Sequence, residues 1–204
     1  MDNCLTSRFA ERTLAWVLAH PTRYPRTRLA GGPVPPRDTE RTSVYRAEDL
    51  YARMCERAHP PMGPPVLTDL AGSQVLLPAE RRFGDLDSVQ RFVDVVLPAA
   101  CELWQVHLPP VQVRRRKGAA KAHWEPPSTI ALAEDQAWLR EFIVLHELAH
   151  HIDHHTRGKQ PAPAHGTSFR TALCRLHTLA TGPVGGWALG VVFDLELGGD
   201  LAAE

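Results

Sequence analysis

The sequence has no excess of charge of either sign and no long apolar run. Lys and Arg together number 23, as do Asp and Glu, so the formal net charge is zero. A neutral chain has no general electrostatic attraction to nucleic acid or to a membrane surface. No apolar stretch approaches the roughly 18 residues needed to span a bilayer. We therefore expect no membrane association, and nucleic-acid binding is not favoured.

Cysteines are few, and they share no short spacing: Cys4, Cys55, Cys101 and Cys174. The absence of a CxxC pair excludes a zinc ribbon, and the scattered positions do not suggest a dense disulfide framework. The N-terminal apolar run over residues 14–19 is too short for the core of a signal peptide. These features favour a soluble, cytoplasmic protein.

Proline, arginine and glycine are concentrated in residues 20–37, a composition that resists helix and strand and is typical of a linker. A length of 204 residues suits one domain with a small addition. We expect residues 1–36 to form an N-terminal appendage, with a short amphipathic helix over 8–20. Residues 37–204 are expected to form the folded domain.

Apolar periodicity predicts both helices and short strands in residues 37–204. Helices are expected over residues 42–58, 88–104, 135–155, 167–180 and 187–197. Strands are expected over residues 73–77, 111–114, 120–124 and 129–133. Asp87 is expected to cap the second helix, with Phe92, Val95, Val96, Ala99 and Leu103 facing inward. Glycines at 182, 185 and 186 are expected to separate the last two helices. This order predicts an α+β fold with a small antiparallel sheet.

The most informative motif is His146-Glu147-Leu148-Ala149-His150, which has the HExxH pattern. Residues four apart lie one turn apart on the same face of a helix, so both imidazoles can reach one metal ion. A carboxylate directly after the first histidine can deprotonate a metal-bound water. The pattern predicts a zinc site in which Glu147 is the general base and zinc-activated water attacks an amide carbonyl.

The residues around the motif support a true site helix over a chance match. Phe142, Leu145, Ala149 and Ile152 have helical spacing and are expected to form a buried stripe beside the two histidines. No proline or glycine interrupts residues 136–157. The segment therefore combines a core face with a site face, as a metal-binding helix should.

A catalytic zinc site usually has three protein ligands, so a third is needed. Metzincins would require a glycine at 152 and a histidine at 156, and the chain has Ile152 and Thr156. We favour His165, because the proline-rich loop before it allows the chain to turn back and Gly166 permits a close approach.

Other candidates for the third ligand stay open at lower rank. Asp153 and His154 continue along the same helix as His150, and three turns of a straight helix converge poorly on one tetrahedral ion. Asp153 is better explained as a partner that orients an imidazole, or as a solvated charge. Glu196 belongs to a distant apolar helix. His151 and His155 are expected to face away, as exposed or half-buried residues.

His146-Glu147-xx-His150 followed by His165-Gly166-xx-Phe169 resembles the SprT-like zincins, whose pattern is HExxH, a loop and HGxxF. The resemblance implies a zincin fold with zinc held by His146, His150 and His165, and Phe169 packed under the following helix. The chain is more similar still to a group of uncharacterised actinobacterial metallohydrolases. That similarity extends to residues 37–48, 121–122 and 145–151, and it covers residues 37–197.

Taken together, the sequence predicts a zinc-dependent metallohydrolase, most simply a peptidase acting on a peptide or protein. The alternatives are a zinc-stabilised binding or regulatory module without catalysis, and a nucleic-acid-associated protease. The basic run at residues 114–117 is more simply a solvated strand end than a phosphate site. Tyr45, His123 and His177 are each candidates to stabilise an oxyanion, and the sequence does not choose among them.

Overall fold

The computed structural model describes residues 36–116, 122–158 and 161–198. The expected appendage over residues 1–36, with its helix over 8–20, lies outside the described residues except for Pro36. Among the described helices, none combines the length and the apolar character that crossing a membrane requires. Helices and two small sheets make up the described part, which confirms the α+β class.

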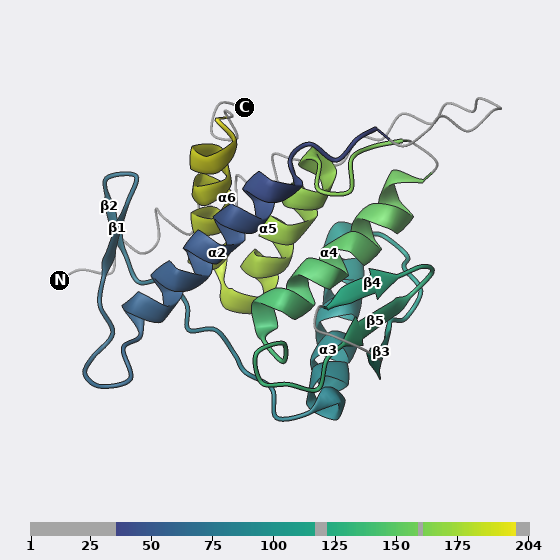
Figure 1. The fold of residues 1–204 in the computed structure, drawn as a ribbon, viewed down its shortest axis with the longest axis horizontal. Helices are drawn as coiled ribbons and strands as arrows, with labels where there is room; N and C mark the ends of the chain where they lie inside the picture. Colours follow the sequence, from purple (N-terminus) through teal and green to yellow (C-terminus); the bar gives the residue numbers. More distant parts are fainter. Residues whose placement is uncertain (1–35, 117–121, 159–160, 199–204) are drawn as a thin grey trace.

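Five helices form most of the described chain (Figure 1): α2 Arg41–Ala58, α3 Leu86–Trp104, α4 Glu141–Arg157, α5 Thr167–Thr181 and α6 Pro183–Leu197. Helix α4 lies in the middle, with α2, α5 and α6 on one side and α3 and a three-stranded sheet on the other (Figure 1). Leu145, Leu148 and Ala149 are fully buried there, while Phe142 of the expected stripe is only half-buried. The HExxH helix is therefore a core element.

The larger sheet is mixed, so the predicted antiparallel sheet is wrong. Its strands are β3 Gln112–Arg115, β4 His123–Glu125 and β5 Thr129–Leu132, in the order β3-β5-β4. Strand β5 is parallel to β3 and antiparallel to β4. The apolar run Ile130–Leu132 is fully buried, as is usual for a central strand, and this places β5 between the other two. A separate hairpin pairs β1 Thr68–Leu70 with β2 Ser73–Val75.

Helix α3 begins earlier than predicted and turns a different face inward. Its cap is Asp85 rather than Asp87, because the Asp85 carboxylate accepts the Ser88 backbone N–H at 2.7 Å. The predicted inward residues Val95 and Leu103 are 70% and 55% exposed. The buried stripe consists of Val89, Val93, Val96, Leu97 and Ala100. Apolar residues occur on more than one face of this helix, so spacing alone selected the wrong one.

Helices α5 and α6 are separated by Gly182 alone, so the expected break through Gly186 is wrong. Gly185 and Gly186 lie in the first turn of α6, after Pro183 at a position where proline is well tolerated. A Cβ on Gly186 would lie 1.9 Å from Thr178 Oγ1 of α5. These glycines are therefore needed for close packing of the two helices.

The N-terminus of α4 is capped by a residue far away in the sequence. The sequence predicted that the helix starts at Asp135, but it begins at Glu141. Residues 135–138 form a turn instead, because the Asp135 carbonyl and carboxylate accept backbone N–H groups of that turn. Arg140 occupies the cap position but provides no side-chain cap. Glu80 Oε1 instead accepts the Phe142 backbone N–H at 3.2 Å, and Glu80 Oε2 accepts Arg140 Nε at 2.9 Å. Glu80 thus fixes the start of the HExxH helix.

We expect Glu80→Ala to lower the free energy of unfolding by about 2 kcal/mol, because the helix N-terminus loses its acceptor and Arg140 keeps only its ion pair with the exposed Glu56. Urea unfolding at neutral pH measures this change. Glu134→Ala is the matched control, since its ion pair with Arg115 is exposed and should contribute under about 0.5 kcal/mol. Equal losses in the two variants would contradict a capping role for Glu80.

Candidate metal centre

The three predicted histidines come together from helix α4 and the loop that leads to α5. His146 and His150 lie one turn apart on α4, and His165 directly precedes α5. A tight turn presents His165, since the Gly166 N–H donates to the Pro163 carbonyl at 3.1 Å. A Cβ at Gly166 would approach that carbonyl oxygen to 3.3 Å, so a small residue suits this turn.

Potential ligand atoms of His146, His150 and His165 all lie within 4.8 Å of one another. The Nε2 atoms of His146 and His150 are 3.2 Å apart. Two ligands of a tetrahedral zinc ion, each at about 2.0–2.1 Å, would be about 3.3 Å apart. His165 Nε2 is buried and has no hydrogen-bond partner. Three imidazoles close enough to bind one metal ion, with an orphaned nitrogen among them, fit such an ion.

Burial keeps two of these imidazoles neutral, which is the form that binds metal. Burial, together with the neighbouring His146 and His165, lowers the pKa of His150 to about 2. Burial also lowers the pKa of His165, although its hydrogen bond to Asp38 opposes the effect. Burial lowers the pKa of His146 as well, but Glu48 and Glu147 together outweigh it and the net pKa is raised.

Two carboxylates that sequence reasoning did not select contact the outer nitrogens of these rings. His146 Nδ1 donates to Glu48 Oε1 at 2.8 Å, and His165 Nδ1 donates to Asp38 Oδ2 at 2.6 Å. Glu48 belongs to α2, and Asp38 lies just before that helix. They are 98 and 127 residues from their partners, so no local spacing could reveal the contacts. The resemblance to actinobacterial metallohydrolases includes residues 37–48, but it assigned no role to Asp38 or Glu48.

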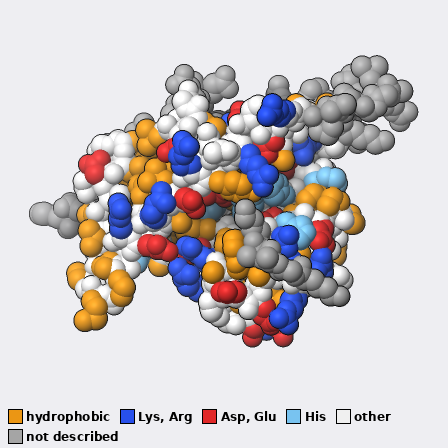
Figure 2. All heavy atoms as spheres, in the orientation of Figure 1, with side chains coloured by type: hydrophobic (Ala, Val, Ile, Leu, Met, Phe, Trp, Pro, Cys, Tyr) orange, Lys and Arg blue, Asp and Glu red, His pale blue; other side chains and the backbone are white. Residues whose placement is uncertain are grey.

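Aromatic rings surround the cluster. Phe169 is fully buried, and its ring centroid lies 5.0, 4.4 and 5.0 Å from those of His146, His150 and His165. Tyr45 stacks on His146 at 5.5 Å and meets His165 edge-on at 5.2 Å. Phe169 therefore packs directly against the three histidines, and Tyr45, a residue that is 40% exposed, adjoins two of them. Histidine side chains are visible beside basic residues on the face of the molecule that Figure 2 shows.

Glu147 is buried next to the cluster and faces the edge strand β4. Glu147 is only 5% exposed, and this burial raises the pKa of its carboxyl group. The neighbouring His146 and a hydrogen bond from the Trp124 backbone lower the pKa of Glu147, but burial prevails. A carboxylate whose pKa is raised toward neutrality is suited to accept and release a proton.

The alternative third ligands are engaged elsewhere. Asp153 accepts Ser168 Oγ at 2.5 Å and pairs with Arg157 at 3.0 Å, so it is neither a solvated charge nor a partner of a clustered imidazole. His154 is exposed, with its ring 4.8 Å from that of Trp124. Glu196 pairs with Arg46 at 3.7 Å.

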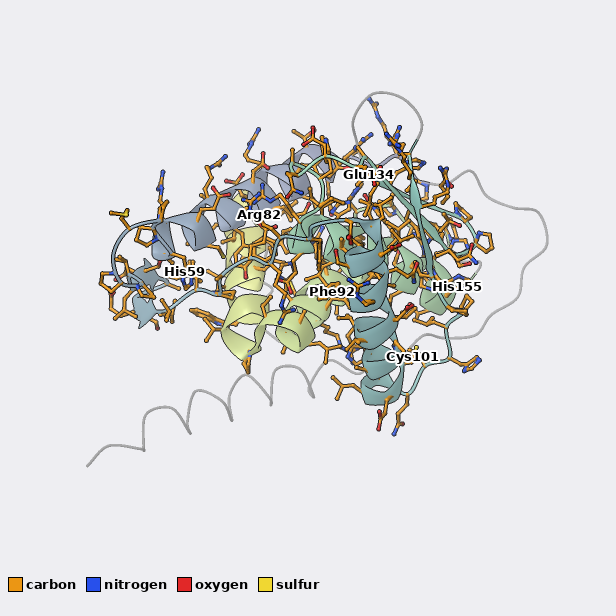
Figure 3. The ribbon with its side chains drawn as sticks, turned by 90° about the horizontal axis from the view of Figure 1, so that it is seen from below. His59, Arg82, Phe92, Cys101, Glu134 and His155 are labelled. Carbon is orange, nitrogen blue, oxygen red and sulfur yellow. The ribbon has the colours of Figure 1, made fainter. Side chains whose placement is uncertain are left out.

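The two remaining histidines of the helix also bond away from the cluster. His151 is fully buried, contrary to prediction, and its Nε2 donates to the Pro109 carbonyl at 3.0 Å. Burial lowers the pKa of His151 to about 4, so it is a neutral core residue. His155 is half-buried, as predicted, and donates to the Pro127 carbonyl at 2.7 Å (Figure 3 shows it beside the sheet).

The basic run is largely neutralised by ion pairs. Arg114 pairs with Glu125 at 2.5 Å, and Arg115 pairs with Glu134 at 3.3 Å. Arg116 contacts His123 Nδ1 at 2.8 Å, while Lys117 lies outside the described residues. These pairs favour the interpretation of a solvated strand end.

Comparison with models of protein families found no match, and searches of curated proteins and of solved structures found no significant similarity. The resemblance to SprT-like zincins therefore depends on the motif residues alone. What the structure adds is the convergence of those residues on one point.

Proposed function

We propose that this protein is a zinc-dependent hydrolase of the zincin type that cleaves amide bonds in peptides or proteins. The observation that carries the proposal is the convergence of His146, His150 and His165 beside the buried Glu147. Three histidines leave one position of a tetrahedral zinc ion open, which is the arrangement of catalytic rather than structural zinc sites. The resemblance in sequence to SprT-like zincins supports the same class.

The three histidines would hold the ion, with neutral His150 and His165 supplying lone pairs. Zinc at this position would supply Lewis acidity and lower the pKa of water to about 7. Glu147 accepts the proton of the attacking water on a carboxylate oxygen and passes it to the leaving amine. Its raised pKa makes the carboxylate a stronger base for the first step.

Among the three candidates for oxyanion stabilisation, the contacts favour Tyr45. Its ring adjoins two of the proposed ligands and is partly exposed, so its hydroxyl can meet a substrate. His177 is only 2% exposed and packs against Tyr51 and Phe142. His123 Nε2 is paired with Glu125 at 2.7 Å. We therefore assign to the Tyr45 hydroxyl the role of stabilising the oxyanion that develops during the reaction.

A peptide substrate would have a strand edge available beside Glu147. Within the described chain, β4 pairs with β5 on one side only, and the Trp124 backbone reaches Glu147. Exposed strand edges bind extended peptides through main-chain hydrogen bonds. This arrangement supports a peptide over a compact small molecule as the substrate.

Incubation of zinc-loaded protein with a mixed peptide library, read by mass spectrometry, tests the proposal. We expect new peptide termini that are absent from the metal-free sample and return when zinc is restored. Zinc-loaded, folded protein that leaves the library intact would contradict a peptidase and favour a metal-stabilised binding module.

A further inference from the structure

The proposed metal centre includes two carboxylates that touch no proposed ion. Asp38 and Glu48 belong to one short segment of the chain, and each contacts the outer nitrogen of a different proposed ligand. Both side chains are mostly buried, at 22% and 20% exposed. Two such contacts from one segment point to a common role.

A carboxylate at Nδ1 determines which ring nitrogen can bind metal. A carboxylate oxygen only accepts, so the proton of a neutral imidazole stays on Nδ1 and the Nε2 lone pair is free. The bond also fixes the plane of the ring, and therefore the direction of that lone pair. In both His146 and His165, the nitrogen left free is the one on the side of the cluster.

The charge balance of the site also favours a role for these two carboxylates in metal binding. Three neutral imidazoles bring no negative charge to a buried divalent cation, and an unpaired buried charge is strongly unfavourable. Asp38 and Glu48 supply two negative charges just behind the rings, so ion, ligands and carboxylates together are neutral. Glu147 then remains available for proton transfer.

The position of Asp38 is itself fixed by a neighbouring ion pair. Glu40, at the start of α2, pairs with Arg170 of α5, and Arg170 also reaches the His165 carbonyl at 3.4 Å. This pair anchors the chain on both sides of the Asp38–His165 contact. The carboxylate is therefore held against His165 by the fold, independently of any metal.

We propose that Asp38 and Glu48 are positioning residues that hold His165 and His146 in the metal-binding tautomer and orientation. This inference rests on the proposed metal site and extends it to the segment between residues 38 and 48. It gives that segment a function in metal binding in addition to its packing.

Asp38→Asn and Glu48→Gln test the proposal, because each amide keeps the size of the side chain and removes its charge. We expect each variant to bind zinc about 10- to 100-fold more weakly in competition with a chromogenic chelator. Asp38→Ala and Glu48→Ala, which also lose the acceptor, should bind more weakly still. Asp49→Asn is the matched control, since Asp49 is exposed on the same helix and should change zinc affinity less than about twofold.

Two further measurements separate positioning from general stabilisation. In the cobalt-substituted protein, the visible absorption bands should shift in both amide variants and stay unchanged in Asp49→Asn. Proton–nitrogen NMR of the metal-free protein should show the Nδ1–H tautomer of His146 and His165 in the wild type. Each tautomer should be lost only in the Ala variant of its own partner, because an amide oxygen can still accept the Nδ1–H. Failure of one variant to fold therefore leaves the other as a test.

The possible failures are distinguishable. Wild-type protein that binds neither zinc nor cobalt would overturn the proposed metal site itself. Wild-type protein that binds metal, with unchanged affinity and spectrum in both amide variants and unchanged tautomers in both Ala variants, would overturn only the role of Asp38 and Glu48.

Discussion

Glu147→Gln is expected to retain its metal and lose about 10³-fold in kcat/KM on any peptide that the wild type cleaves. The amide has the size of the carboxylate and can occupy the same space, but it cannot accept the proton of the attacking water. Because Glu147 is buried and its pKa is raised, removal of its charge should also leave the fold intact. Zinc content and urea unfolding should therefore match the wild type.

Glu196→Gln is the control for that experiment. Glu196 is a carboxylate that the sequence left open, at low rank, as a third ligand, but here it pairs with Arg46. We expect its zinc content and kcat/KM to change by less than about twofold, as for other partly exposed ion pairs. A Glu147→Gln variant that cleaves peptides at the wild-type rate would remove Glu147 from the mechanism.

His165→Ala is expected to lower zinc affinity by far more than the roughly 10- to 100-fold typical of changing a residue behind a ligand. The substitution removes a nitrogen that is buried and unpartnered unless a ligand binds it. It also leaves two histidines, whereas zinc sites in proteins are built from three or four protein ligands. Competition with a chromogenic chelator measures the change.

His154→Ala provides the matched control on the same stretch of chain. His154 follows His150 by four residues, as His150 follows His146, but it is exposed and its ring lies tilted against that of Trp124. Its removal should leave zinc affinity within about twofold of the wild type. If His154→Ala loses zinc and His165→Ala retains it, the ligand set is wrong.

The local parts of the site could be predicted from the sequence, because they depend on spacing within one helix. The i, i+4 relation places His146 and His150 on one face whatever surrounds the helix. His165 also followed from the sequence, since a proline-rich loop and Gly166 allow a return of the chain. Its proximity to the other two histidines is now a feature of the structure.

The parts that could not be predicted depend on tertiary contacts. Glu80 caps α4 from 62 residues away, and Asp38 reaches His165 across 127 residues. The sequence predicted strands near β3, β4 and β5, but pairing depends on which strand is central, and the buried apolar run of β5 decided it. In α3, apolar residues on two faces left the buried one to be chosen by packing.

Metal analysis of the purified wild-type protein tests the central claim most directly. We predict about one zinc ion per chain by inductively coupled plasma mass spectrometry, lost on dialysis against a chelator and regained on addition of zinc. Folded wild-type protein that contains no transition metal and takes up none when zinc is added would contradict the account.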